Sequence, residues 1–339
     1  MVLRALLCLV LLTACKTQKP GKWVAVDFGR PDSVIFELNF VSDGIGWMTT
    51  WNGEAKGTEG WEVFKTTDGG KSWSLWAKQA ELKIKYTYFV TDKLGWALSL
   101  KNDILHTTDG GESWFVQRTA GKSKVRYKDR PSMEVIEPIN QLYFVSPRVG
   151  WAWGGGKKED SFEQEGIFLL TVDGGKTWHR QKYPFDHELQ AIFFLDPDIG
   201  WASDRKAGLF RTVDGGSSWQ KEPDDIRRPP ITDIFFTDLM HGWIVGPDGY
   251  TAHTTDGGKK WLRVRLQKRS YLRSVAFIDS SNGWVAGEDS TICRTTDGGQ
   301  TWSMEEVEVK QATITKLRIL PSGAVWAAGN GVLLKLQAE

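Results

Sequence analysis

Short apolar runs recur along the chain, and turn residues bound each of them. One such run is Ile192-Phe193-Phe194, and a second, Leu209-Phe210, follows after a polar gap. Runs of this length, rich in β-branched and aromatic residues, predict β-strands. A Gly-Trp pair lies between the two runs and predicts the start of another strand. The same pair begins at Gly46, Gly95, Gly150, Gly200, Gly242 and Gly283.

A second motif follows each Gly-Trp pair, with the pattern Thr-Thr/Val-Asp-Gly-Gly-x-x-Trp. Its two glycines tolerate positive φ, and its aspartate can accept hydrogen bonds from backbone N–H groups two residues on, so the motif predicts a tight turn between strands. We also expect its Trp ring to pack between repeats. The aspartates are Asp68, Asp109, Asp173, Asp214, Asp256 and Asp297, at intervals of 41, 64, 41, 42 and 41 residues.

Each repeat therefore predicts four antiparallel strands, a to d, and about 41 residues with four strands make a propeller blade. Residues 314–336 supply strands a to c without the Asp motif, and residues 22–26 supply an isolated strand. We predict an all-β, seven-bladed β-propeller of four-stranded antiparallel blades, closed by an N-terminal strand that places Trp23 and Trp326 in one blade. The propeller is expected over residues 22–337, with blades at about 34–78, 84–118, 138–182, 189–222, 231–266, 272–308, and 313–337 plus 22–27.

The N-terminus reads as a targeting segment. Arg4 precedes a short apolar run that ends in Leu12-Thr13-Ala14-Cys15, which resembles a bacterial lipobox. We expect residues 1–15 to be a lipoprotein signal peptide, Cys15 to carry the lipid, and residues 16–21 to form a tether. An ordinary secretory signal with a chance cysteine is the alternative. The expected location is lipid-anchored and extracytoplasmic, and Lys16 after the cysteine favours the outer membrane by resemblance to Gram-negative lipoproteins.

Composition narrows the function. The 43 Lys and Arg nearly balance the 42 Asp and Glu, which argues against nucleic-acid binding through overall positive charge. Cys8 would be removed with the signal peptide and Cys15 would carry lipid, so Cys293 would be the one cysteine left to form a disulfide. We therefore expect no internal disulfide in the mature chain. Of the 18 Trp, fourteen belong to the repeats, including Trp23 and Trp326.

The six aspartates do not predict a catalytic or metal site. Each lies in its own hairpin one blade apart, so they ring the molecule instead of converging, and we interpret them as structural. His106 and His253 occupy a position that holds Lys, Leu or Arg in other repeats. Catalytic elbows, phosphate-binding loops and zinc-protease motifs are missing from the sequence. We expect no cofactor and no metal.

The segments that interrupt the repeat pattern are the candidate binding elements. Blades 1 and 3 carry insertions between strands b and c, and a long basic link joins blade 2 to blade 3. In an antiparallel blade, b–c turns and blade-to-blade links emerge on the face opposite the Asp motifs. We predict that this face, around blades 1 to 3, binds a partner; merely solvated loops are the alternative. The candidate residues are Trp51, Trp61, Trp153, Lys124, Arg126, Lys128 and Arg130.

The Asp motif resembles the Asp-box (BNR) repeat of sialidases, sortilin-type receptors and xyloglucanases. The combination of this motif with a preceding Gly-Trp-Ala/Val resembles the photosystem II stability and assembly factor family, and the resemblance extends from Trp23 to Leu336. It is clearest in Gly283-Trp284-Val285-Ala286, which precedes the motif of Asp297. That resemblance implies a non-catalytic, protein-binding assembly factor, lumenal in phototrophs, whose cyanobacterial members are lipoproteins. The alternative is a sialidase-like or other glycosidase, or a carbohydrate-binding module with Trp51, Trp61 and Trp153 on sugar rings.

Overall fold

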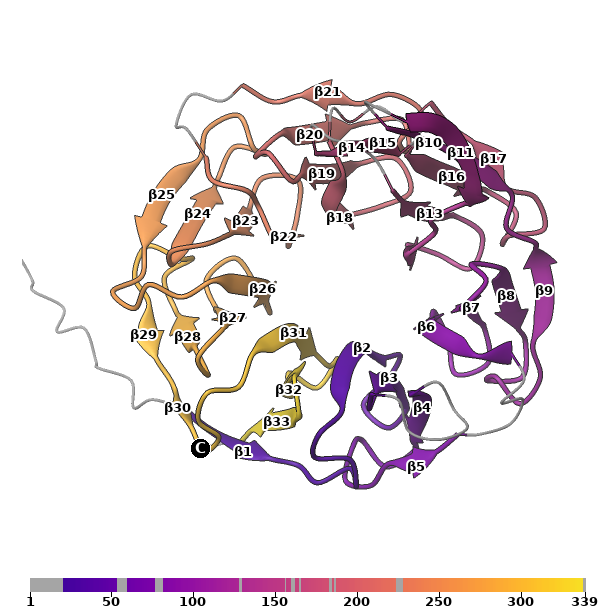
Figure 1. Cartoon of the computed structure of the whole chain (residues 1–339). Coiled ribbons are helices and arrows are strands. Elements are labelled where there is room, and N and C mark those ends of the chain that lie inside the picture. Colours follow the sequence, from indigo (N-terminus) through magenta and orange to yellow (C-terminus); the bar gives the residue numbers. More distant parts are fainter. Residues whose placement is uncertain are drawn as a thin grey trace, which may run out of the picture.

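The computed structural model shows a ring of seven antiparallel β-sheets around a central channel (Figure 1). It describes residues 21–53, 60–76, 82–127, 130–155, 157–159, 162–164, 166–182, 185, 187–223 and 228–337. The predicted seven-bladed propeller is confirmed. The expected signal peptide, Cys15 and most of the tether lie outside the described residues. Within those residues, no helix is long and apolar enough to span a bilayer.

The first six blades each hold four strands, which follow chain order from the channel to the rim. Blade 1 contains β2 (Val34–Phe40), β3 (Gly46–Trp51), β4 (Trp61–Thr66) and β5 (Ser74–Leu75). Blade 2 contains β6 (Ile84–Phe89), β7 (Gly95–Ser99), β8 (Ile104–Thr107) and β9 (Phe115–Arg118). Blade 3 contains β12 (Gln141–Phe144), β13 (Gly150–Gly154), β16 (Ile167–Thr171) and β17 (His179–Arg180). Blade 4 contains β18 (Leu189–Phe194), β19 (Gly200–Asp204), β20 (Leu209–Thr212) and β21 (Gln220–Lys221). Blade 5 contains β22 (Asp233–Phe236), β23 (Gly242–Val245), β24 (Tyr250–Thr254) and β25 (Leu262–Arg265). Blade 6 contains β26 (Leu272–Phe277), β27 (Gly283–Gly287), β28 (Ile292–Thr295) and β29 (Ser303–Met304).

The seventh blade joins the two ends of the chain. It contains β31 (Ile314–Ile319), β32 (Val325–Gly329), β33 (Val332–Leu336) and the N-terminal β1 (Lys22–Ala25). Trp23 lies opposite Leu336, and Trp326 lies in the same sheet, as predicted; both rings are buried. The sequence did not predict a fifth strand, β30 (Glu306–Val307), which pairs parallel to β1 on its outer side.

A phenylalanine at the end of the innermost strand explains why Gly precedes Trp. In blade 3, Phe144 pairs with Gly150, and a Cβ added to Gly150 would lie 2.3 Å from the Phe144 ring. Trp96 of blade 2 stacks on that ring with 3.5 Å between centroids, and Trp178 of the Asp motif packs against it edge-on at 5.8 Å. Glycine is therefore required because the phenylalanine lies where a side chain would project.

This three-ring arrangement recurs at other blade interfaces. Stacked pairs join neighbouring blades with centroid distances of 3.5 to 3.6 Å: Trp47–Phe89, Trp151–Phe194, Trp201–Phe236 and Trp243–Phe277. The expectation that the Trp of the Asp motif packs between blades is confirmed: Trp219 of blade 4 contacts Phe168 of blade 3, and Trp261 of blade 5 packs in one cluster with Trp201 of blade 4. The Trp of the Gly-Trp pair makes the face-to-face contact with the phenylalanine of the next blade, and the Trp of the Asp motif packs edge-on against that same phenylalanine.

The Asp motif is a turn stabilised by hydrogen bonds within the motif. In blade 2, the Ser113 amide donates to Asp109 Oδ1 at 2.9 Å, the Ser113 hydroxyl donates to Oδ2, and the Gly111 amide donates to the Thr107 hydroxyl. The aspartate therefore binds an amide four residues on, not two as expected. Hydrogen bonds from Ser113 are the main cause that lowers the pKa of Asp109 to about 2. Gly110 and Gly111 adopt the expected positive φ.

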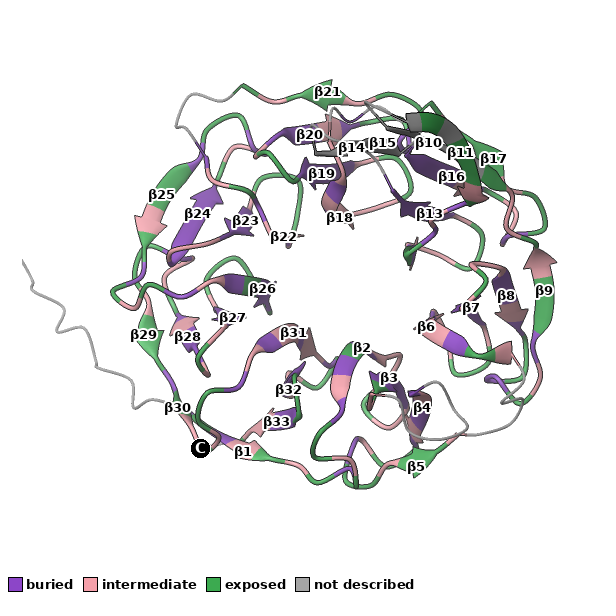
Figure 2. Ribbon diagram, viewed as in Figure 1, coloured by how far each residue is buried: buried purple, intermediate pink, exposed green. Residues whose placement is uncertain are grey.

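Burial follows the same radial order (Figure 2). The second strand of each blade is almost wholly buried, whereas the outermost strands β5, β17, β21 and β29 are exposed and only two residues long. Short outer strands leave little free edge for pairing with other chains. The core therefore lies between blades, around the stacked rings.

An eighth sheet lies outside the ring. It has the order β11-β10-β15-β14, with β10 (Lys122–Tyr127) and β11 (Arg130–Ile136) from the long link before blade 3. The other two strands, β14 (Lys157–Glu159) and β15 (Phe162–Gln164), come from the insertion in blade 3. Two insertions far apart in the repeat thus fold into one unit, which we call the auxiliary sheet.

Candidate partner-binding face

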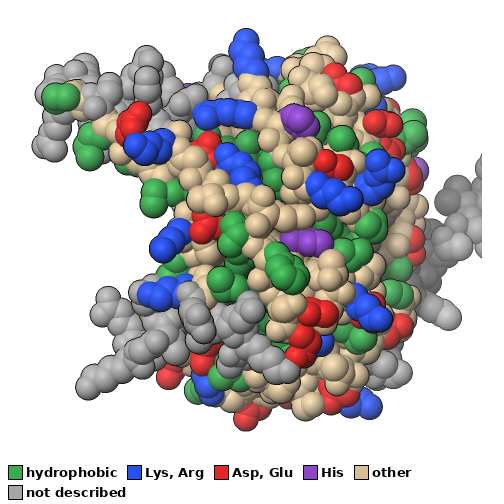
Figure 3. Space-filling view, turned by 90° about the vertical axis from the view of Figure 1, so that its right-hand side faces the viewer, with side chains coloured by type: hydrophobic (Ala, Val, Ile, Leu, Met, Phe, Trp, Pro, Cys, Tyr) green, Lys and Arg blue, Asp and Glu red, His purple; other side chains and the backbone are tan. Residues whose placement is uncertain are grey.

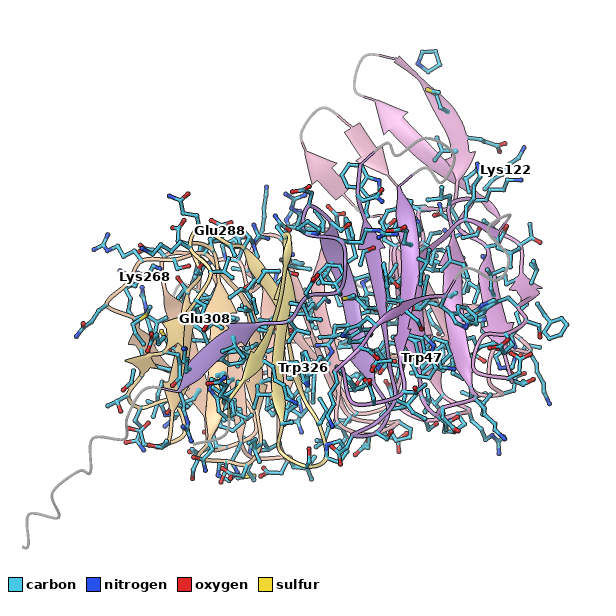
Figure 4. The ribbon with its side chains drawn as sticks, turned by 90° about the horizontal axis from the view of Figure 1, so that it is seen from below. Trp47, Lys122, Lys268, Glu288, Glu308 and Trp326 are labelled. Carbon is cyan, nitrogen blue, oxygen red and sulfur yellow. The ribbon has the colours of Figure 1, made fainter. Side chains whose placement is uncertain are left out.

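The auxiliary sheet projects from one face of the propeller (Figure 4). Lys122 lies at its base, and Lys268 and Glu288, from a blade-to-blade link and a b–c turn of blade 6, lie on the same side (Figure 4). We call this side the loop face. The Asp motifs lie at the opposite ends of the antiparallel strands. In the space-filling view the auxiliary sheet overhangs a hollow beside the propeller body (Figure 3).

In the strand register of the auxiliary sheet, residue types of opposite charge occupy facing positions. Lys124 stands opposite Glu134, Arg126 opposite Glu163, and Lys157 opposite Glu163 as well. An ion pair of 3.1 Å joins Lys122 and Glu134. Opposite charges across a sheet stabilise strand pairing by roughly 0.2–1 kcal/mol per pair. The basic link and the insertion of blade 3 therefore pair in a register that places residues of opposite charge at facing positions.

Glu137 fixes the base of the auxiliary sheet to the propeller. Its buried carboxylate forms ion pairs with Arg118 of β9 at 2.5 Å and with Arg180 of β17 at 3.6 Å. It also accepts a hydrogen bond from the Gly121 amide at 2.9 Å. One carboxylate thus links blade 2, blade 3 and the segment that leads into β10.

An aromatic cluster lies at the loop-face end of blade 1. Trp51 pairs with Trp61 across β3 and β4, and the Trp61 ring lies 4.8 Å from that of Phe36. Trp51 is 37% exposed and Phe36 is 43% exposed. Phe36 also lines the central channel. Apolar rings exposed together are typical of an interaction site.

Trp153 lies elsewhere and is only 4% exposed. It packs in a cluster with Phe168 and Phe185 in blade 3 and contributes to the channel wall. Its ring is therefore not free to stack on a sugar. Trp76, the remaining Trp outside the repeats, packs against Trp114 at 6.4 Å between blades 1 and 2.

The basic residues predicted to bind a partner belong to the long link before blade 3. Lys124 and Arg126 lie in β10 and Arg130 begins β11, whereas Lys128 falls outside the described residues. The binding role of these residues and of Trp51 and Trp61 stays a prediction. Of the residues that the structure describes, no three His, Cys, Asp or Glu side chains gather as a metal-binding group.

The central channel encloses a cavity of about 1000 Å³ lined by the innermost strands of the blades. Glu37 on β2 is 2% exposed and forms ion pairs with Lys316 at 3.2 Å and with Arg318, both on β31. Arg318 also donates to the Leu38 carbonyl at 2.7 Å. Burial by itself would raise the pKa of Glu37, but the two cations outweigh it and hold the pKa below its ordinary value.

A second carboxyl group, Asp233, lies in the wall of the same channel. It accepts hydrogen bonds from the Ser274 hydroxyl at 3.0 Å and the Val275 amide at 2.9 Å, both in the next blade. Burial nevertheless raises the pKa of Asp233. Tyr143 donates to the Phe194 carbonyl of the next blade, and burial raises its pKa to about 12. These channel groups join neighbouring blades.

Sequence analysis missed Phe36, Glu37 and Glu137. A signal for Glu37 exists, because the position three residues before the last residue of each innermost strand lines the channel. That position holds a charged residue in three blades: Glu37, Asp233 and Lys316. Charged residues inside otherwise apolar runs could have marked the channel. Glu137 has no such signal, because its partners come from strands distant in sequence.

The comparisons with known proteins agree with the architecture. Residues 170–271 and 263–336 match the family described as photosynthesis system II assembly factor YCF48. The solved structure of YCF48 bound to a D1 peptide has a TM-score of 0.71 and 18% identity, over 94% of this chain and 97% of that chain. The matched residues make up just under half of the chain, and over them the chain is similar to this family. The resemblance predicted from the sequence is confirmed over these residues.

Two further solved structures have a similar fold. YCF48 from Cyanidioschyzon merolae has a TM-score of 0.70 and 20% identity, over 93% of this chain and 98% of that one. Virginiamycin B lyase from Staphylococcus aureus, an enzyme by name, reaches 0.65 with 11% identity, over 94% and 98%. No curated protein matches the sequence. Structural likeness at such identities shows the fold alone, so the function must be argued from the site.

Proposed function

We propose that this propeller is a non-catalytic, protein-binding scaffold or assembly factor that holds another extracytoplasmic or membrane protein on its loop face. The family that matches its C-terminal half is described as an assembly factor, and a structure of similar fold holds a peptide of another protein. The observation that carries the proposal is the exposed rings of Phe36 and Trp51 at the loop-face end of blade 1, on the face from which the auxiliary sheet projects. Aromatic residues are enriched at protein interfaces.

The test is chemical cross-linking in native membranes followed by capture of the chain. We expect Phe36→Ala and Trp51→Ala each to lower the yield of the cross-linked partner at least tenfold. Leu262→Ala is the matched control, because Leu262 is an exposed apolar residue on the rim of blade 5. Equal yields from all variants would contradict the proposal.

Carbohydrate binding remains the second candidate because Trp51 presents exposed ring surface. A glycan array distinguishes the two functions. Specific glycan binding that Trp51→Ala abolishes, together with partner capture that the same variant leaves unchanged, would favour the carbohydrate-binding module over the assembly factor.

We also propose that lipid on Cys15 anchors the chain to a membrane on its extracytoplasmic side. The support is the lipobox-like sequence before Cys15 and the polar residues after it. Cys15→Ser should release the protein from the membrane fraction and remove radiolabelled fatty acid. Cys8→Ser, inside the signal sequence, should leave both unchanged, and a labelled, membrane-bound Cys15→Ser variant would refute the anchor.

A further inference from the structure

The N-terminal strand begins at the end of the propeller that carries the Asp motifs. β1 runs antiparallel to β33, with Trp23 opposite Leu336 and Ala25 opposite Leu334. β33 is the third strand of blade 7, and in the other six blades the third strand runs toward the Asp motif. Lys22, the first residue of β1, therefore lies on the side of the Asp motifs, which we call the Asp-motif face. The loop face lies at the other end of the strands.

The start of β1 limits how far the propeller can lie from a lipid on Cys15. Only residues 16–21 separate Cys15 from β1. A fully extended chain of that length spans roughly 20–25 Å, whereas a relaxed flexible chain spans roughly 12–15 Å. A six-residue strand such as β3 is about 20 Å long, and the auxiliary sheet rises further from the loop face (Figure 4). Turning the loop face toward the bilayer would therefore need a tether that is almost fully extended.

Two Asp motifs present an apolar residue at an exposed position of this face. Val172 and Val213 follow the first Thr of the motifs in blades 3 and 4, and each side chain is more than half exposed. The same position holds an exposed threonine in the other four motifs: Thr67, Thr108, Thr255 and Thr296. The turn forms equally well with threonine, so its own structure does not require valine there.

The a–b turn of the neighbouring blade 5 departs from the repeat in the same way. Its tip is Leu239-Met240, and both side chains are nearly half exposed. The tips of blades 1 to 4 and 6 are Asp43-Gly44, Asp92-Lys93, Pro147-Arg148, Pro197-Asp198 and Ser280-Ser281. Three consecutive blades therefore present exposed apolar side chains at turn tips of one face. Apolar side chains that gather on a surface mark an interaction site, with a protein or with a membrane.

The charge of the Asp-motif face decides which lipid surface it fits. The a–b turns and Asp motifs of blades 1 to 6 hold thirteen Asp and Glu against six Lys and Arg. Hydrogen bonds from Thr177 are the main cause that lowers the pKa of Asp173 to about 2, so this carboxylate stays charged at neutral pH. An anionic surface would repel the face, whereas a zwitterionic surface would accept its apolar tips.

We propose that the Asp-motif face rests on the bilayer that holds the Cys15 lipid, with Val172, Val213, Leu239 and Met240 against the interfacial region of zwitterionic lipids. The loop face then points away from this bilayer, so a partner reaches it through a segment that extends above the membrane. The inference rests on the proposed lipid anchor and adds the orientation of the anchored propeller.

The test uses the mature chain from Cys15 onward, coupled through Cys15 to a maleimide phospholipid in phosphatidylcholine vesicles. Cys293 is buried, so the coupling is directed to Cys15. Benzoylphenylalanine replaces Ser280 on the Asp-motif face or Gln267 in a blade-to-blade link on the loop face, and both positions are exposed. We expect at least tenfold more lipid adduct from position 280 by mass spectrometry. Equal adducts from the two positions would overturn the proposed orientation.

A combined variant tests the apolar tips. It carries the residues that blade 6 has at the same positions: Val172→Thr, Val213→Thr, Leu239→Ser and Met240→Ser. The lipid adduct from position 280 should fall at least threefold at equal coupling. Leu262→Ser removes an exposed apolar residue from the rim and is the matched control, which should leave the adduct unchanged. An adduct that the combined variant also leaves unchanged would overturn the role of the tips.

The lipid composition tests the charge argument. Vesicles in which half of the lipid is phosphatidylglycerol should give at least threefold less adduct from position 280 at low salt, because like charges repel. Equal adducts from the two kinds of vesicle would overturn the preference for zwitterionic lipid.

Light scattering of the Cys15→Ser chain tests a competing occupant. A dimer that the combined variant converts to a monomer would show that a second copy covers the Asp-motif face and would overturn the proposal. The vesicle assay supplies the lipid chemically and reports on the orientation alone. Fatty-acid labelling of Cys15 in cells reports on the anchor, so the failure of one proposal is distinguishable from the failure of the other.

Discussion

At the scale of single residues, the glycine before each buried Trp is a packing requirement. Gly150 lies under the Phe144 ring, and the same ring stacks on Trp96 of the preceding blade. Any side chain at Gly150 would push Phe144 out of this stack. The blade interface therefore depends on a residue that makes no side-chain contact of its own.

We predict that Gly150→Ala destabilises the propeller by about 1–3 kcal/mol, because overpacking forces rings and backbone to shift. Gly44→Ala is the control, since its nearest neighbour, the Thr67 carbonyl, lies at an ordinary 3.7 Å from the added Cβ. Denaturant unfolding of both variants measures the difference. Equal stabilities would show that the Phe144 ring does not need this space.

Glu37 gives stability a pH dependence. Its folded pKa lies below the ordinary 4.5, so its contribution is complete above about pH 4.5 and is lost as the pH falls through the folded value. Glu37→Gln leaves Lys316 and Arg318 without their carboxylate. We expect a loss toward the lower end of about 3–5 kcal/mol at pH 7, because both cations are partly exposed.

Thermal unfolding from pH 7 down to about pH 3 measures this effect. The difference in melting temperature between the wild type and Glu37→Gln should narrow as the pH falls below about 4.5. A difference that stays constant over that range would mean that the charge of Glu37 is not what stabilises the channel.

At the scale of elements, the auxiliary sheet and the propeller are joined through Glu137. We predict that Glu137→Gln speeds hydrogen exchange in β10 and β11, because it weakens the ion pairs to Arg118 and Arg180, while exchange in the blade strands stays slow. Glu134→Gln, which breaks only an exposed ion pair, is the control and should change little. Faster exchange throughout the blades would contradict a local role.

The blades could be predicted from the sequence because their strands repeat. Phe194, Gly200 and Trp201 recur at fixed spacing in other blades, and apolar alternation marks each strand. The auxiliary sheet could not be predicted this way. Its strands are rich in Lys and Glu, and Arg126 meets Glu163 across a gap of 37 positions with no repeat to guide the pairing. Likewise, the burial of Trp153 depends on Phe185, which lies outside the repeat pattern.

At the scale of the whole molecule, the ring is closed by a strand of four residues. β1 lies between β33 and β30, and Lys22 pairs with Glu308 at 3.1 Å. Trp23 is fully buried at this closure. Because the first strand completes the last blade, the two ends of the chain stabilise one another.

We predict that Trp23→Ala destabilises the propeller by about 3–5 kcal/mol, the cost of emptying a buried Trp site. Trp51→Ala should cost much less, because Trp51 is partly exposed. Calorimetry of both variants provides the comparison. A Trp23→Ala protein as stable as Trp51→Ala would mean that the N-terminal strand contributes little to closure.

The most direct test of the central claim, that the loop face binds the partner, is photo-cross-linking from both faces of the propeller. A benzoylphenylalanine at position 51 samples the loop face, and one at position 213, an exposed valine in an Asp motif, samples the opposite face. In native membranes, we predict a specific protein adduct from position 51 and none from position 213. An adduct from position 213 alone would contradict the account.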